Sequence, residues 1–180
     1  LDGTLFPYTT LFRSCHAIGG SGRVGEQDLA ERAAKDLGAA AALHRRLGLN
    51  RRSRDTFVRV FNPDAKRDGF ESAHTLVAVV TDDMPFLVDS IGMVFAAAGI
   101  AVHLIVHPVL QVTRDARGRL RSVSTESTPG SKPESWQLYE IDRQFDAAHM
   151  DALERGIRDT LGDVQVAVTD WMPMRRTMRE

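Results

Sequence analysis

The stretch from His74 to Thr113 constrains the fold of this chain most strongly. An apolar run, Thr75–Val80, is followed by apolar residues with helical spacing and then by a long run rich in Val, Ile and Leu, Ala101–Val112. The helically spaced residues are Leu87, Ile91, Val94 and Ala98, and Gly99 follows them. Short apolar runs on either side of a 3.6-residue stripe predict a strand, a helix and a second strand.

The segment Asp82–Leu87 joins the first predicted strand to the helix. We expect the Asp83 carboxylate to cap the helix and Pro85 to lie in its first turn. Asp82 and Asp83 could instead form a pair of carboxylates for acid–base chemistry. Side chains of adjacent residues diverge, so capping is the favoured interpretation.

The chain after Thr113 predicts a hairpin, a strand, a second helix and a last strand. Asp115–Gly118 is the expected hairpin turn, which leads into a returning strand, Arg119–Ser124. Thr125–Pro133 is rich in Ser, Thr, Pro and Gly and predicts a loop before a strand at Trp136–Ile141.

Asp146 is the expected cap of the second helix, whose apolar stripe ends before Gly162. The stripe residues are Met150, Leu153, Ile157 and Leu161. The alternating residues Val164, Val166 and Val168 then predict a last strand. The resulting order, β-α-β-β-α-β, is typical of an α+β, ferredoxin-like fold.

The chain before His74 predicts a leader, a helix and a short strand. Leu1–Ser14 matches no element of the fold, so residues 1–22 are expected to be an unstructured, non-native leader. Glu26–Leu47 carries a helical stripe, and Thr56–Phe61 alternates like a strand. The stripe residues are Leu29, Ala33, Leu37, Ala40, Leu43 and Leu47.

Two motifs in this N-terminal part suggest ligands but have simpler interpretations. Gly20–Gly25 fits G-x-G-x-x-G, yet no strand precedes it and no second strand follows its helix, so we interpret it as linker glycine and not as an NAD site. A basic run suggests nucleic acid, but a net charge of −1 favours a solvated helix end. Its members are Arg45, Arg46, Arg51, Arg52 and Arg54.

The remaining candidates for chemistry are weak. His103 and His107 lie about 13 Å apart if both are in one strand, too far to share a metal ion without a bulge at Pro108. Ser90 has no neighbouring base at helical spacing. The sequence therefore predicts no catalytic, cofactor-binding or metal-binding residues. A single cysteine, Cys15, and the absence of a long apolar stretch favour a cytoplasmic protein without a membrane segment.

Five ordered blocks of the sequence resemble the N-terminal region of the large bacterial NAD-specific glutamate dehydrogenases. The similarity extends from about Val24, through Arg59–Pro63, to the C-terminus. In that family this region is an ACT-like domain, and the catalytic domain lies far downstream. The five blocks are Thr81–Ser90, Val102–Leu110, Glu134–Trp136, Glu140–Arg143 and Asp170–Met174.

The resemblance implies a fragment of an enzyme that uses NAD to deaminate glutamate oxidatively, this piece being regulatory or scaffolding and itself inactive. It also implies contacts with other domains of the same polypeptide and a homo-oligomeric parent. We expect an N-terminal extension at 23–72, the ACT-like domain at 73–174 and the start of a linker at 175–180.

The candidate effector site is the turn that ACT domains use for amino acids. Amino-acid-binding members typically have D-x-P-G-L there, whereas this chain has Phe86 in place of the glycine. The candidate residues are Asp82, Asp83, Met84, Pro85, Phe86 and Leu87.

Two alternatives stay open, a stand-alone amino-acid-sensing module and an RNA-recognition module. The RNA-recognition module needs aromatic residues on its central strands, but Thr75–Thr81 contains none, and Trp136 and Tyr139 are expected on opposite faces of their strand.

Overall fold

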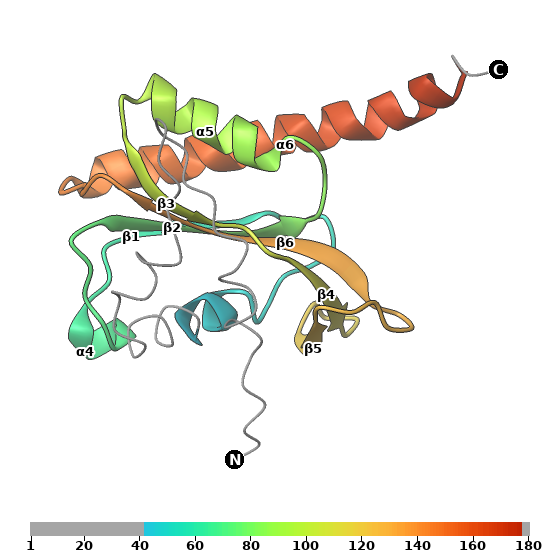
Figure 1. Ribbon diagram of the computed structural model, residues 1–180, viewed down its shortest axis with the longest axis horizontal. Helices are drawn as coiled ribbons and strands as arrows, with labels where there is room; N and C mark the ends of the chain where they lie inside the picture. The colour runs from blue at the N-terminus through green and yellow to red at the C-terminus, as the bar shows by residue number, and fades with distance from the viewer. Residues whose placement is uncertain (1–41, 178–180) are drawn as a thin grey trace.

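The computed structural model describes the backbone of residues 42–177 and the side chains of residues 42–169. Strands form one antiparallel sheet of order β1-β2-β6-β4-β5, with β3 also paired to β6, and helices α5 and α6 lie across one face of it (Figure 1). Residues 42–47 are also helical. The elements are β1 (Phe57–Phe61), α4 (Ala65–Asp68), β2 (Thr75–Asp82), α5 (Leu87–Ala97), β3 (Val102–Val106), β4 (Val109–Arg114), β5 (Leu120–Ser124), β6 (Lys132–Ile141) and α6 (Ala147–Thr177).

The predicted strand–helix–strand unit and the hairpin are confirmed. β2, α5 and β3 follow one another, and Gly99 takes a positive φ of 67° just after α5. β4 and β5 are joined by a turn in which the Gly118 amide donates to the Asp115 carbonyl at 2.9 Å. This mixture of helices and antiparallel strands confirms the predicted α+β, ferredoxin-like class.

The long Val- and Ile-rich run is two strands and not one. β3 and β4 pair with different parts of β6, and the chain between them passes through His107 and Pro108. Proline has no amide hydrogen to donate, so a continuous ladder is interrupted there. The Pro108 carbonyl still accepts a hydrogen bond from the Trp136 amide at 2.9 Å, so the chain between β3 and β4 stays next to β6.

The prediction of a last strand at Val164–Val168 is wrong, as is the predicted helix end at Gly162. Both segments belong to α6, which runs without a break from Ala147 to Thr177. The last strand of a β-α-β-β-α-β unit would pair beside β2, and that edge is taken by β1, which pairs with β2 along its whole length. The N-terminal strand thus stands where a C-terminal strand was expected.

Side chains of α6 complete the hydrogen bonds at the outer edge of β1. The Val60 amide donates to Glu154 at 3.1 Å, and Arg158 donates to the Val58 carbonyl at 3.4 Å. Glu154 and Arg158 also pair with each other at 2.8 Å, one helical turn apart. The two side chains occupy the edge that a further strand would need.

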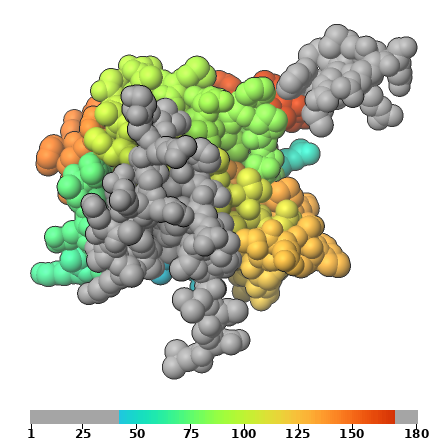
Figure 2. All heavy atoms as spheres, viewed as in Figure 1, coloured from blue at the N-terminus to red at the C-terminus, as the bar shows by residue number. Residues whose placement is uncertain are grey.

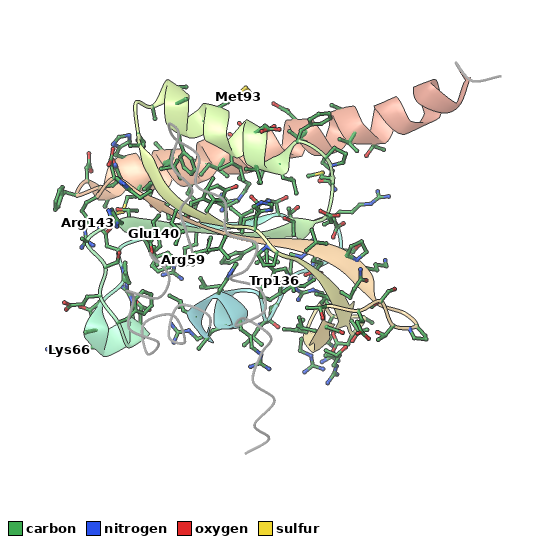
Figure 3. All side chains as sticks on the ribbon, viewed as in Figure 1. Arg59, Lys66, Met93, Trp136, Glu140 and Arg143 are labelled. Atoms are coloured by element: carbon green, nitrogen blue, oxygen red, sulfur yellow. The ribbon has the colours of Figure 1, made fainter. Side chains whose placement is uncertain are left out.

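Apolar residues cover both faces of the sheet, because alternate residues of each strand point to opposite sides. On one face, strand residues such as Val77, Val79 and Tyr139 pack against α5 and α6. On the other, Leu43 and Phe70 cover β1 and β2, and Trp136 packs on β4. Trp136 and Tyr139 therefore lie on opposite faces, as the sequence predicted, and Figure 3 shows Trp136 directed away from the helices.

The contact between Trp136 and the segment after residue 47 requires a glycine. A Cβ atom added at Gly48 would lie 2.4 Å from the indole ring of Trp136. The Gly48 amide donates to the His44 carbonyl at 3.0 Å, which marks the predicted helix end. The rest of that predicted helix, the predicted leader at 1–22 and the Gly20–Gly25 motif lie outside the described residues.

In Figure 2, α5 lies along the top of the molecule, and the β4–β5 hairpin lies at the lower right. Within residues 42–177, no helix combines the length and the apolar character needed to cross a membrane.

Candidate functional site

The turn from Asp82 to Leu87 carries the chain from β2 into α5, but Asp83 does not cap the helix. α5 begins at Leu87, so the N-cap residue is Phe86, and no side chain bonds to the helix end there. Asp83 lies three residues before that cap, too early to reach the N2 and N3 amides. Its own amide donates to the Pro133 carbonyl at 3.2 Å, and partial burial raises the pKa of its carboxyl. The capping prediction is therefore wrong, and Pro85 precedes the helix.

Phe86 holds a backbone conformation that normally selects glycine. Its φ is 69°, in the left-handed region, where a Cβ atom costs about 1–3 kcal/mol. Glycine, which D-x-P-G-L has at this position, adopts such a φ without strain, whereas this chain has an aromatic side chain there.

The Phe86 side chain is 54% exposed and lines a groove between α5 and α6 of about 400 Å³. Met93, on the outer side of α5 (Figure 3), and Val168 of α6 also line this groove. Ser90 lies beside it and is buried.

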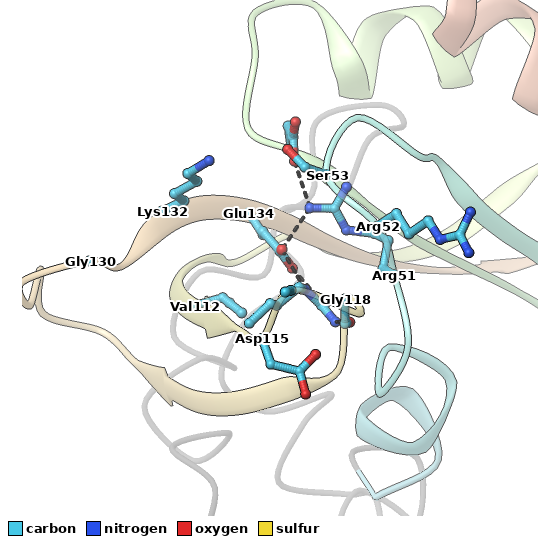
Figure 4. Close-up of a pocket in the computed structure, with 12 residues that line it drawn as sticks. Arg51, Arg52, Ser53, Val112, Asp115, Gly118, Gly130, Lys132 and Glu134 are labelled. Atoms are coloured by element: carbon cyan, nitrogen blue, oxygen red, sulfur yellow. Dashed lines mark hydrogen bonds and ion pairs between the residues drawn. The ribbon is translucent and has the colours of Figure 1, made fainter.

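Asp82, the first residue of the turn, belongs to a cluster of charged residues at the other end of β2 from α4. Arg51 donates through one terminal nitrogen to both Asp82 and Glu134, each at 2.6 Å (Figure 4). Arg114 donates to both Glu134 oxygens, at 2.8 and 2.9 Å, and Trp136 donates to one of them at 3.1 Å. We call Arg51, Asp82, Arg114 and Glu134 the charge cluster.

The centre of the charge cluster is almost free of solvent. The side chains of Arg51 and Glu134 are 2% and 4% exposed. Burial raises the pKa of Glu134, but hydrogen bonds from Arg114 and Arg51 outweigh it, so the pKa lies below its usual value. The interpretation of the basic run as a solvated helix end is therefore wrong for Arg51, which is an internal ion-pair partner.

The charge cluster also fixes the segment after residue 47 to the β4–β5 hairpin. Arg114 donates to the carbonyls of Gly48 and Gly118, each at 3.0 Å, and the Arg51 amide donates to the Gly118 carbonyl at 3.0 Å. A Cβ atom at Gly118 would lie 2.6 Å from the Arg51 carbonyl oxygen. Three segments far apart in the sequence thus meet at one point.

In the sequence, His103 is a candidate together with His107, but in the structure the ring of His103 lies beside that of His74. The two ring centroids are 4.3 Å apart, and the His103 Nε2 is 2.8 Å from the Asp142 carboxylate. His107 lies beyond the end of β3, in the break before β4. Among the residues that the structure describes, no three His, Cys, Asp or Glu side chains are placed to hold a metal ion together.

Sequence reasoning placed Asp82 in a site but missed Arg51, Arg114 and Glu134. Glu134 precedes Trp136 in a strand that was predicted to begin only at residue 136, and Arg51 stood among four other arginines. The partners of Glu134 lie 83 and 20 residues away along the chain. No local pattern identifies a pair at that separation.

Comparisons with known proteins agree on one family. The model of the glutamate dehydrogenase ACT1 domain matches residues 21–157. The chain is 41% identical over 125 residues to the NAD-specific glutamate dehydrogenase of Pseudomonas aeruginosa, and 40% identical over 124 residues to that of Halomonas elongata. Each match covers 68% of this chain and 8% of the relative.

A more distant relative is the NAD-specific glutamate dehydrogenase of Mycobacterium tuberculosis, 29% identical over 144 residues, or 79% of this chain and 9% of the relative. The chain thus matches less than a tenth of the length of each of these relatives. No solved structure matches it significantly.

Proposed function

Because the chain belongs to the glutamate dehydrogenase ACT1 domain family, we propose that it is a regulatory or scaffolding domain of a much larger NAD-specific glutamate dehydrogenase. The observation that carries this proposal is the family match, which spans β1 to β6 and the first part of α6. The names of the relatives support this activity for the parent enzyme, and the small matched share of each relative supports a parent that is much longer than this chain.

In this proposal the parent enzyme oxidises L-glutamate to 2-oxoglutarate and ammonium and reduces NAD. Both substrates bind outside residues 1–180, so the isolated chain is inactive. Its partners are the other domains of the polypeptide in a cytoplasmic homo-oligomer, a location that the single cysteine favours. The stand-alone sensing module remains the alternative, and the two differ in whether the turn before α5 binds amino acids tightly.

We predict that free amino acids bind the turn no more tightly than about 1 mM, or ~4 kcal/mol. The first amides of α5 have no side-chain cap and attract a carboxylate. Against this, Asp89 places negative charge in the first turn of α5, and the Phe86 side chain occupies the glycine position. Titration of glutamate, aspartate, arginine and branched-chain amino acids into 15N-labelled protein measures this. Saturable shifts centred on Asp83–Leu87 below about 0.1 mM would favour the sensing module.

The variant Phe86→Gly, with Phe86→Ala as its matched control, separates the side chain from the backbone. Both remove the ring, but only alanine keeps a Cβ atom at a φ of 69°. We expect the free energy of unfolding of the glycine variant to be about 1 kcal/mol higher than that of the alanine variant. Equal stabilities in urea would show that the turn is not strained. If the ring blocks a pocket, both variants bind amino acids better than the wild type.

A further inference from the structure

A cavity of about 370 Å³ opens above the charge cluster, between the β4–β5 hairpin and the start of β6 (Figure 4). Its volume lies at the lower end of the range for small-molecule sites. Arg51, Arg52, Arg114 and Lys132 line it, together with Asp82, Asp115 and Glu134. The cavity is therefore bordered by charged side chains that come from segments far apart in the sequence.

The acidic residues of the cavity are neutralised by internal partners. Glu134 accepts from Arg51 and Arg114, Asp82 accepts from Arg51, and Asp115 pairs with Arg119 and Arg121 at 2.8 Å each. The backbone amides of Arg119 and Arg117 and the side chain of Arg119 donate to the Asp115 carboxylate, and these hydrogen bonds hold the pKa of that carboxyl at about 2. All three carboxylates of the cavity therefore already have internal partners.

Basic groups remain in excess. Within the described residues, the side chains of Lys132 and Arg52 make no ion pair, and Arg117 adds a further cation at the tip of the hairpin. Lys132 and Arg51 lie on either side of Glu134 in Figure 4, whereas Arg52 extends away from it. The overall net charge is −1, so this excess is local to the cavity and the hairpin.

Within the part of the chain that the structure describes, one donor of Arg51 has no acceptor. Its terminal nitrogens donate to the Asp55 carbonyl, Asp82 and Glu134, but the buried Nε–H makes no hydrogen bond within the described residues. Buried donors are normally satisfied, because an unmet one loses its hydrogen bond to water. An anion oxygen in the cavity would provide an acceptor for this guanidinium.

From these observations we propose that the cavity binds a small phosphate-type oxyanion, held by Arg51 and Lys132. Arginine presents a planar set of donors that matches such oxyanions, and lysine adds a point charge. Asp82, which is 40% exposed, is the group that the anion displaces from Arg51. Since Asp82 begins the turn before α5, occupancy of the cavity alters that turn.

Inorganic phosphate and pyrophosphate, titrated into the full labelled chain at constant ionic strength, test this site. We expect saturable amide shifts at Arg51–Ser53 and Gly130–Glu134, with pyrophosphate binding at about 0.1–1 mM and phosphate more weakly. Shifts at Asp83–Leu87 accompany them. Adenosine diphosphate is titrated for comparison. If the ligand is a nucleotide, adenosine diphosphate binds more tightly than pyrophosphate. If the ligand is free phosphate or pyrophosphate, adenosine diphosphate binds no more tightly.

Three variants make the outcome specific to the cavity. Lys132→Ala is expected to weaken pyrophosphate binding about fivefold or more, and Asp82→Asn to strengthen it about threefold, because a competing carboxylate is removed. Lys66→Ala on α4, an exposed lysine far from the cavity (Figure 3), should leave it unchanged. Shifts that do not saturate, or equal affinities for Lys132→Ala and Lys66→Ala, would overturn the proposal.

Discussion

Replacement of Glu134 by alanine is expected to destabilise the domain by about 3–5 kcal/mol, because two buried guanidinium groups lose their common carboxylate. Arg51 would keep Asp82, and Arg114 would keep only backbone carbonyls as acceptors. The Trp136 indole would also lose the acceptor that lies 3.1 Å away. Chemical denaturation at pH 7 gives the free energy of unfolding directly.

The control for this substitution is Glu126→Ala, which removes an exposed carboxylate from the loop before β6. Surface substitutions of this kind change stability by about 0.5 kcal/mol or less. Glu134→Gln keeps the shape of the side chain but removes its charge, and an intermediate loss is expected. A loss below about 1 kcal/mol for Glu134→Ala would mean that the charge cluster does not fix the three segments that meet there.

Stability is expected to fall by about 2 kcal/mol between pH 7 and pH 5 through His44 alone. Burial lowers the pKa of His44 to about 4, outweighing a hydrogen bond with the Val79 backbone, while an unfolded histidine titrates near 6.5. Between these two values the unfolded chain binds the proton and the folded chain does not. The contribution is thus complete above pH 6.5 and is lost as the pH falls toward 4.

The variant His44→Gln isolates this effect from the other histidines and from the carboxylates. The His44 ring centroid lies 5.3 Å from that of Trp136, so the variant has a lower stability at every pH, and the comparison uses the slope. We expect the difference in unfolding free energy between pH 7 and pH 5 to shrink by about 2 kcal/mol in the variant. Parallel curves for the two proteins would show that His44 is not buried in its neutral form.

Local patterns predicted the centre of the fold well. The run Thr75–Val80 and the helical stripe that begins at Leu87 are long and regular; the strand is buried on both faces, and the helical stripe faces the core. Hairpin chemistry was equally local, since Gly118 takes the positive φ of 81° that its turn requires. These elements follow from residues close together in the chain.

The wrong predictions depended on contacts between distant residues. Val164, Val166 and Val168 alternate like a strand, but the edge that would accept them is filled by β1 from the other end of the chain. Asp83 has the right chemistry for a cap, yet the left-handed Phe86 starts the helix later. Arg51 and Glu134 look like ordinary surface charges until the sheet brings them to 2.6 Å. The resemblance identified the family, and the comparisons confirm it.

The most direct test of the central claim, that this domain accompanies but does not contain the dehydrogenase site, is calorimetric titration of the isolated chain with NAD, with and without glutamate. The account predicts no saturable heat at micromolar NAD and no reduction of NAD in the presence of glutamate. Saturable binding of NAD at micromolar affinity, about 8 kcal/mol, would contradict it.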